Sequence, residues 1–192
     1  MLKYNIEGGS EKCENLYAEI VTGGDYTKAE MEAKPWLKRF NKYNITLPCK
    51  VEYCYDFGYL LTFFNSKIMR EELKAPNGDD WKICNGKVAE EILAHDRRKN
   101  AADKLIPLLD SGIKVWLYHG DLDLRCNWVG GEYVANELDW TGKKEFGKSK
   151  FESTGYGLMR RWENLTFVIV ADAGHMVPMD QPENAYKMLM EF

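Results

Sequence analysis

The sequence predicts an α/β fold, in which helices flank a mostly parallel sheet, and two stretches support this prediction. Residues 115–118 form an apolar run that breaks at Gly120 into a short acidic turn, and residues 165–171 form a second run that is followed by a turn with His175. Short apolar runs bounded by turn residues indicate buried strands. An open α/β sheet places its functional groups beyond the carboxyl ends of such strands. We therefore expect an aspartate and a histidine at the same edge of the sheet.

The composition fits a folded domain and argues against several classes of function. The 192 residues are 45% hydrophobic and 13% aromatic, which suffices for one domain with a buried core. A net charge of -4 argues against nucleic acid and an anionic membrane surface as partners. No apolar run approaches the roughly 20 residues of a membrane-spanning helix. Residues 1–5 do not resemble a signal peptide, so we expect either a cytosolic protein or a chain that lacks its natural start.

The remaining sequence is expected to surround these strands with helices. We interpret residues 1–46 as part of a helical insertion or cap segment and residues 47–192 as the C-terminal part of the core. The charged, glycine-punctuated residues 141–156 are expected to form a surface excursion. Helical patterns occur at residues 14–21, 27–40, 56–74, 88–93, 101–109 and 128–138.

The end of the chain has the clearest helix signals. Asp180 and Glu183 have the spacing of a capping box, and Pro182 would lie in the first turn. A stripe of apolar side chains then follows at helical spacing: Ala185, Met188, Leu189 and Phe192. We expect this helix to bury the stripe against the sheet.

The cysteines and two glycosylation sequons favour an oxidising compartment. The number of cysteines is odd, at five, and no spacing suits a zinc site, but Cys49 and Cys54 flank a tight turn that a disulfide could close. Asn44 and Asn164 each begin a sequon of the form Asn-x-Thr. Sequons often arise by chance, but together with the cysteine pair they favour a protein of the secretory pathway.

The acid and the histidine suggest acyl-transfer chemistry. Such a triad combines a nucleophile, a histidine base and a carboxylate that fixes the tautomer of the histidine. In α/β-hydrolases the chain order is nucleophile, acid, histidine. This chain supplies an acid and then a histidine, each after a strand, but no Gly-x-Ser-x-Gly elbow. Its five serines lie in polar or turn contexts: Ser10, Ser66, Ser111, Ser149 and Ser153.

Two longer motifs give a specific resemblance. Residues 120–130, Gly-Asp-Leu-Asp-Leu-Arg-Cys-Asn-Trp-Val-Gly, resemble the acid loop of the serine carboxypeptidases, α/β-hydrolases of lysosomes, vacuoles and secretions. Residues 173–182, Ala-Gly-His-Met-Val-Pro-Met-Asp-Gln-Pro, resemble their histidine loop. Residues 53–56 and 81–85 match weaker patterns of this family. The resemblance begins near residue 47 and implies the C-terminal part of an α/β-hydrolase fold.

The resemblance implies roles for four residues. Asp123 matches the catalytic acid and His175 the catalytic base. Cys126 matches a thiol beside the acyl side of the substrate, and Met176 matches a residue that lines the leaving-group pocket. The substrate would be a peptide whose C-terminal amino acid is released through an acyl-enzyme, with no cofactor and no metal.

The same resemblance places the rest of the active site upstream of this chain. The nucleophilic serine, the oxyanion hole and the grip on the terminal carboxylate of the substrate would belong to a Ser-bearing half or chain, which is the expected partner. The partner of Cys84 would lie there too, and Cys13 has no good partner in this sequence. A secretory, lysosomal or vacuolar location is implied.

Three other interpretations remain open. The chain could be a non-catalytic fragment or subunit with a binding or structural role. It could belong to another hydrolase of the same fold, such as an esterase, although the Cys-Asn-Trp and Gly-His-Met-Val-Pro motifs argue against this. His119 and Asp121 could bind a metal, but no third ligand has suitable spacing, and Asp121 alone could be a turn residue. If Asp123 is the acid, its carboxylate should lie roughly 2.6–3.2 Å from a ring nitrogen of His175.

Overall fold

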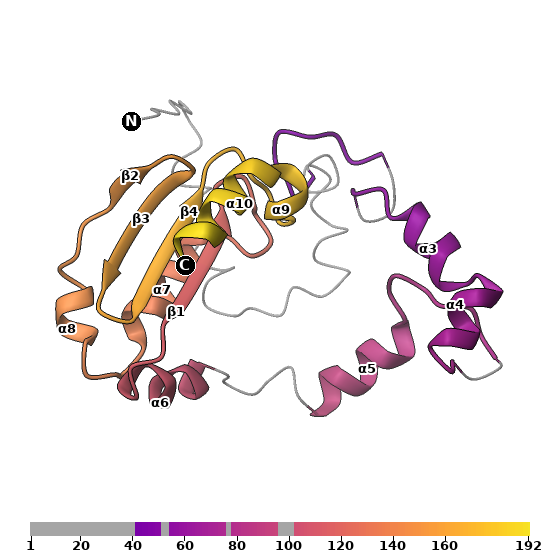
Figure 1. The fold of residues 1–192 in the computed structure, drawn as a ribbon, viewed down its shortest axis with the longest axis horizontal. Helices are drawn as coiled ribbons and strands as arrows, with labels where there is room; N and C mark the ends of the chain where they lie inside the picture. Colours follow the sequence, from indigo (N-terminus) through magenta and orange to yellow (C-terminus); the bar gives the residue numbers. More distant parts are fainter. Residues whose placement is uncertain (1–40, 51–53, 76–77, 96–101) are drawn as a thin grey trace, which may run out of the picture. The chain divides into compact units, whose positions relative to one another are not determined.

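A computed structural model describes residues 41–50, 54–75, 78–95 and 102–192 of the chain (Figure 1). Residues 41–192 form one compact unit, and the fold given below is that of this unit. The helices expected at residues 14–21 and 27–40, and Cys13, lie outside the described residues. The predicted boundary between a cap segment and the core at residue 46 stays a prediction.

A four-stranded sheet organises the fold. Its strands are β1 (Val115–Gly120), β2 (Glu152–Thr154), β3 (Gly157–Trp162) and β4 (Leu165–Val170), in the order β1-β4-β3-β2. β1 and β4 are the two strands that the sequence predicted, and they pair in parallel from Val115 opposite Leu165 to Gly120 opposite Val170. Because the register is unshifted, both strands end at the same edge of the sheet.

The two remaining strands were not predicted, and they change the character of the sheet. β2, β3 and β4 pair antiparallel, so the described sheet is mixed rather than mostly parallel. Only tight turns connect these three strands, and short connections join antiparallel strands, whereas parallel strands need a long crossover. Residues 141–156 are therefore only partly a surface excursion, since β2 begins at Glu152.

Helices surround the sheet, and their bounds refine the predicted ones. Ser66 divides the helix expected at residues 56–74, because its side chain accepts a hydrogen bond from the N–H of Met69 at 3.3 Å and caps a second helix. None of the helices in the described ranges is long and apolar enough to span a membrane. The helices are α3 (Gly58–Phe64), α4 (Lys67–Glu72), α5 (Gly86–His95), the 3-10 turn η2 (Ala102–Lys104), α6 (Leu105–Asp110), α7 (Trp128–Glu137), α8 (Lys143–Phe146), α9 (Val177–Asp180) and α10 (Pro182–Glu191).

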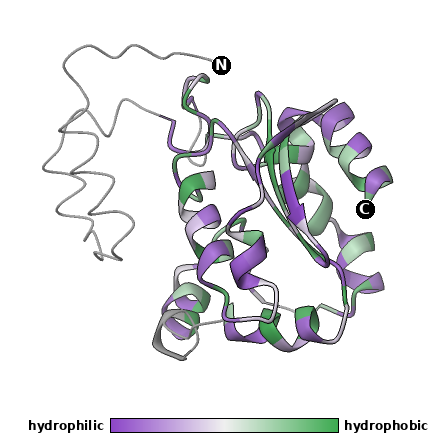
Figure 2. Cartoon of the chain, turned by 90° about the vertical axis from the view of Figure 1, so that its left-hand side faces the viewer, coloured by the Kyte–Doolittle hydropathy of each residue, from purple (hydrophilic) through white to green (hydrophobic). Residues whose placement is uncertain are grey.

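The core lies on both faces of β4, every residue of which is buried. Leu165, Phe167 and Ile169 pack with side chains of α6, α7 and α8, while Val168 and Val170 pack with α9 and α10. In Figure 1, α10 accordingly lies in front of the sheet and α7 behind it. Coverage of both faces explains why β4 is a continuous apolar run rather than an alternating one. Figure 2 shows helices with both hydrophobic and hydrophilic residues, as expected where only one side of each helix is buried.

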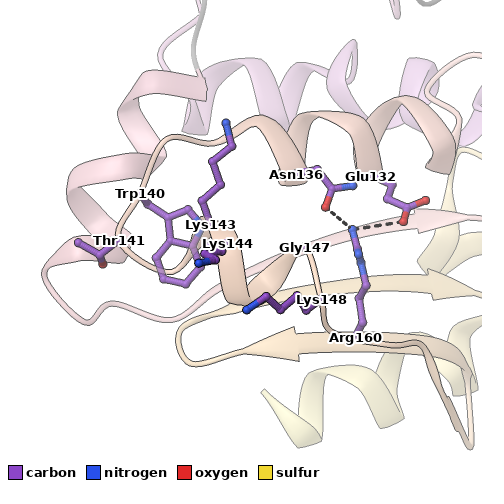
Figure 3. Close-up of a pocket in the computed structure, with 9 residues that line it drawn as sticks. All are labelled: Glu132, Asn136, Trp140, Thr141, Lys143, Lys144, Gly147, Lys148 and Arg160. Carbon is purple, nitrogen blue, oxygen red and sulfur yellow. Dashed lines mark hydrogen bonds and ion pairs between the residues drawn. The ribbon is translucent and has the colours of Figure 1, made fainter.

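Arg160 of β3 explains why that strand escaped prediction. Its side chain is only 5% exposed, yet it is charged and so interrupts the apolar pattern. Its Nη2 atom lies 3.2 Å from a carboxylate oxygen of Glu132 and donates to the side-chain oxygen of Asn136 at 2.8 Å, both on α7 (Figure 3). The guanidinium also lies over the rings of Phe146 and Phe151, 4.5 and 5.2 Å from their centroids. This buried ion pair links the sheet to α7.

The capping box predicted for the last helix is wrong. Gln181 is the N-cap residue of α10 and makes no side-chain capping bond, although Pro182 does occupy the first turn as expected. The Asp180 carboxylate instead accepts a hydrogen bond from the N–H of Gly174 at 2.7 Å. The local spacing of residues 180 and 183 was therefore misleading, because Asp180 is occupied by a loop outside its own helix.

Gly120 allows the ends of β1 and β4 to approach each other. A Cβ atom at this position would overlap the backbone carbonyl oxygens of Ala173 and Gly174, which follow the turn after β4. Backbone atoms cannot move aside as the tip of a flexible side chain can, so residue 120 has to be glycine for steric reasons.

We predict that Gly120→Ala lowers the free energy of unfolding by about 2 kcal/mol or more, because the methyl group collides with backbone. Urea denaturation followed by tryptophan fluorescence measures this change. Gly155→Ala is the matched control, since a Cβ atom there meets no atom within 4 Å, and it should change stability little. Equal effects of the two substitutions would contradict the steric argument.

Candidate active site

Asp123 and His175 meet where β1 and β4 end. The Nδ1 atom of His175 lies 2.8 Å from the Oδ2 atom of Asp123, which confirms the contact expected from the sequence. Asp123 is 6% exposed, and its other oxygen, Oδ1, accepts the N–H groups of Arg125 at 2.8 Å and Cys126 at 3.2 Å. The carboxylate is therefore fixed by its own loop and directs one oxygen at the imidazole.

This contact determines which nitrogen of His175 is left for chemistry. A carboxylate can only accept a hydrogen bond, so Nδ1 carries the proton and Nε2 of the neutral ring has a free lone pair. No hydrogen bond to Nε2 is formed within the described ranges, and the side chain is 32% exposed. The arrangement suits a general base whose tautomer is fixed by a carboxylate.

Asp121 does not take the place of Asp123. Its Oδ1 atom accepts the N–H of Ala173 at 3.2 Å, so this carboxylate binds the backbone of the turn after β4. Burial raises the pKa of Asp121, and the nearby charge of Asp172 raises it further. Asp121 thus stabilises the turn that leads to His175, in agreement with its interpretation as a turn residue.

The backbone around His175 is held by residues to which the sequence analysis gave no role at the site. The N–H groups of residues 174–176 donate in turn to Oδ2 of Asp180, the carbonyl oxygen of Tyr43 and the hydroxyl oxygen of Tyr55, at 2.7, 2.7 and 3.5 Å. The Tyr43 ring also lies 5.3 Å from the imidazole, centroid to centroid. The sequence signals for this group were the weak motif at residues 53–56, which contains Tyr55, and the motif at residues 173–182, which contains Asp180.

Cys126 lies beside the Asp–His pair. One ligand atom from each of Asp123, Cys126 and His175 falls within 4.8 Å of the others, the only such group in the part of the chain that the structure describes. Burial raises the pKa of the Cys126 thiol, and the charge of Asp123 raises it further. A metal ion bound by all three would have to replace the hydrogen bond between Asp123 and His175. The thiol stays neutral near pH 7, which suits a contact surface better than a nucleophile.

His119 has a structural place rather than a catalytic one. Its Nδ1 atom lies 2.9 Å from the backbone oxygen of Cys126, and its ring packs 5.6 Å from that of Phe167. These contacts support the loop that carries Asp123. Met176 is half-buried just before α9, next to His175. The substrate contacts predicted for Cys126 and Met176 stay predictions.

The structure tests the predicted disulfide but not the two predicted glycosylation sites. Cys49 and Cys54 form a disulfide, as expected, and Cys84 is an exposed free thiol. Asn44 is only 3% exposed, and its Nδ2 atom donates to Asp180 at 3.3 Å, so a glycan there would have to break this contact. The Nδ2 atom of Asn164 donates to the carbonyl oxygen of Leu109 at 2.9 Å. Glycosylation of either asparagine stays a prediction.

Comparison with known proteins agrees with this geometry. The family model of the serine carboxypeptidases matches residues 3–192. Serine carboxypeptidase-like 49 of Arabidopsis thaliana is 39% identical over 155 residues, which are 78% of this chain and 30% of that protein. Serine carboxypeptidase 3 of Triticum aestivum is 35% identical over 158 residues, or 79% of this chain and 30% of that protein. The chain thus spans about a third of the length of these relatives.

A solved structure extends the likeness to the fold. Kex1Δp, a prohormone-processing carboxypeptidase from Saccharomyces cerevisiae, matches with a TM-score of 0.64 and 25% identity over 94% of this chain and 45% of that one. The strands and flanking helices described above therefore belong to an α/β-hydrolase fold. Within that class, the chain belongs to the serine carboxypeptidase family of hydrolases.

The raised pKa of Cys126 gives a test of the site's electrostatics. We predict that Asp123→Asn speeds alkylation of Cys126 by iodoacetamide at pH 8 between about two- and tenfold, because loss of the negative charge lowers the pKa and raises the thiolate fraction. Mass spectrometry of the alkylated peptides gives the rate. Cys84 is the internal control, and Asp139→Asn, an exposed aspartate, the control variant. An unchanged Cys126 rate would contradict the proximity of the two groups.

Proposed function

We propose that this chain supplies the acid and base of a serine-type carboxypeptidase, an enzyme that releases C-terminal amino acids from peptides. The observation that carries this proposal is the hydrogen bond between Asp123 and His175, 2.8 Å long, at adjacent strand ends of a serine carboxypeptidase chain. The nucleophilic serine and the oxyanion hole are assigned to an upstream half.

His175 acts as a base and then as an acid in each half of the proposed reaction. Its Nε2 atom first takes the proton of the serine hydroxyl while the serine oxygen attacks the carbonyl carbon of the last peptide bond. The protonated ring then gives this proton to the leaving amino acid as the C–N bond breaks. Water, deprotonated by the same nitrogen, hydrolyses the acyl-enzyme and restores the serine. Asp123 holds Nδ1–H throughout and stabilises the imidazolium.

The serines of the chain support assignment of the nucleophile elsewhere. Ser66 caps α4, and the hydroxyl groups of Ser111 and Ser149 donate to nearby backbone carbonyl oxygens. Ser153 lies in β2. None of these four, the serines that the structure describes, hydrogen-bonds to His175. A serine placed near Nε2 therefore has to come from another segment.

The free edge of β1 supports an upstream half as the partner. β1 is the outer strand of the described sheet and pairs only with β4 there, so one row of its backbone donors and acceptors is available to a further strand. Tyr118 on this strand is 44% exposed, and Trp116 and Phe192 form part of an apolar hollow beside it. A Ser-bearing half that adds strands at this edge would cover these groups.

A non-catalytic role is the second candidate, because the chain spans only about a third of its relatives. In that case the Asp–His pair would persist as a structural contact within a binding subunit. The disulfide between Cys49 and Cys54 suits an oxidising compartment in either case, so we also propose passage through the secretory pathway.

The activity test uses a chimera in which this chain replaces the matching C-terminal part of serine carboxypeptidase 3 of Triticum aestivum. The chimera should release the C-terminal amino acid from a blocked dipeptide at mildly acidic pH. His175→Ala should lower kcat by several orders of magnitude, and Asp123→Asn by about 10⁴, because the wrong tautomer is then favoured. Asp121→Asn should cost far less, and Asp139→Asn nothing.

The isolated chain is the complementary case. It should show no peptidase activity, because a base without a nucleophile or oxyanion donors has nothing to acylate and nothing to stabilise the tetrahedral oxyanion. Turnover by the purified chain alone, abolished by a serine-directed acylating reagent, would contradict the assignment. A folded chimera that is inactive with every peptide would favour the non-catalytic role.

The exposed edge leads to a further prediction. The chain made alone should self-associate, since unpaired strand edges and apolar patches promote aggregation. Size-exclusion chromatography with light scattering measures the mass. Tyr118→Lys should shift the distribution toward monomer, and Tyr59→Lys, at a more exposed tyrosine of α3, is the control. A monodisperse wild-type monomer would contradict the prediction.

A further inference from the structure

We propose that Asp180 is a positioning residue which, together with Tyr43 and Tyr55, sets the orientation of His175. This inference rests on the proposed function, since it concerns the geometry of the catalytic base. We call the group formed by Tyr43, Asn44, Tyr55 and Asp180 the histidine clamp.

The clamp holds the peptide backbone rather than the imidazole ring. The N–H groups of residues 174–176 are three consecutive donors, and each is bound by a different member of the clamp. Three consecutive N–H groups outside a helix or strand have no regular backbone partners, so they need others if they are to be removed from water. Fixing all three restricts the backbone torsions on both sides of His175 and hence the direction of its side chain.

Asp180 is the centre of the clamp because three segments converge on one of its oxygens. Oδ2 accepts hydrogen bonds from the N–H of Gly174 at 2.7 Å, the hydroxyl of Tyr55 at 2.8 Å and Nδ2 of Asn44 at 3.3 Å. Bonds to a carboxylate are roughly twice as strong as bonds between neutral groups. An asparagine at this position could still place an oxygen where Oδ2 lies, but this oxygen would be neutral, so all three bonds to it would be weaker.

Tyr55 connects Asp180 to the backbone on the C-terminal side of His175. Its hydroxyl donates to Asp180 and accepts the N–H of Met176, so it joins the two flanks of the loop. Burial raises the pKa of Tyr55, and the hydrogen bond to Asp180 raises it further. The hydroxyl therefore keeps its proton, and its role as donor, at neutral and mildly acidic pH.

The close fit at Gly174 shows how closely the clamp approaches the loop. A Cβ atom there would overlap the carbonyl oxygen of Tyr43 and would lie 2.7 Å from Cβ of Asn44 and 2.8 Å from Oδ2 of Asp180. The Cys49–Cys54 disulfide closes the chain between the clamp residues at positions 43–44 and 55. The disulfide therefore limits how far Tyr43 and Asn44 can move from Tyr55, and these residues hold the backbone at residues 174–176.

Two variants test the clamp within the chimera described above. Asp180→Asn removes the charge, and Tyr55→Phe removes the hydroxyl but keeps the ring, which packs 6.3 Å from that of Tyr43. Each should lower kcat by about tenfold to a hundredfold, because a small displacement of a catalytic group has effects of this size. KM should change less than about twofold, because no clamp residue is assigned to substrate binding. Asp139→Asn and Tyr59→Phe are the matched controls, on exposed side chains, and should leave kcat unchanged.

A double substitution distinguishes positioning from general destabilisation. Because Asp180 and Tyr55 are hydrogen-bonded to each other and support the same loop, Asp180→Asn with Tyr55→Phe should lower kcat by clearly less than the product of the two single effects. Additive losses, equal rises in KM, or a kcat that falls only as the fraction of folded protein falls would overturn the proposal.

A measurement that does not depend on enzyme activity tests the histidine clamp separately from the proposed function. Hydrogen exchange of the backbone amides at residues 174–176, followed by NMR in the folded chimera, should be at least about tenfold faster in Asp180→Asn, while amides of β4 exchange as before. Wild-type protection without peptidase activity would contradict the proposed function and leave the clamp in place. Activity with unchanged exchange in Asp180→Asn would overturn the clamp alone.

Discussion

The parallel pairing of β1 with β4 is the constraint on which the site depends. Its unshifted register brings Gly120 and Val170 level, so the loops that follow open at one edge. The absence of a side chain at Gly120 then lets the two turns touch, and Asp121 binds the second turn through the N–H of Ala173. The contact between Asp123 and His175 follows from this placement, although 52 residues separate them in the chain.

The three aspartates near the site have different roles because different hydrogen-bond donors surround them. Asp123 receives two backbone N–H groups on one oxygen and presents the other to His175. Asp180 receives three donors on a single oxygen and supports the histidine backbone. Asp121 caps a turn. The identity of the side chain alone therefore does not decide its role, because the direction of the neighbouring donors does.

How much of this could be read from the sequence depended on the range of the interactions. β1 and β4 were predictable because their apolar runs are local, and the Asp–His contact followed from their pairing. β3 was not, because Arg160 is charged yet buried, and its partner Glu132 lies on another element. Asp180 was misassigned to a capping box for the same reason, since its donors Asn44 and Tyr55 are 136 and 125 residues away.

The order of the loop around His175 depends on whether the disulfide between Cys49 and Cys54 has formed. Tyr43 and Tyr55 contact the loop from the two sides of this cross-link. In newly made, reduced chain the two tyrosines are joined only by the intervening backbone, and bringing them together costs more conformational entropy. If the chain passes through the secretory pathway as proposed, oxidation there completes the support of His175, so that maturation of the acid–base pair coincides with disulfide formation.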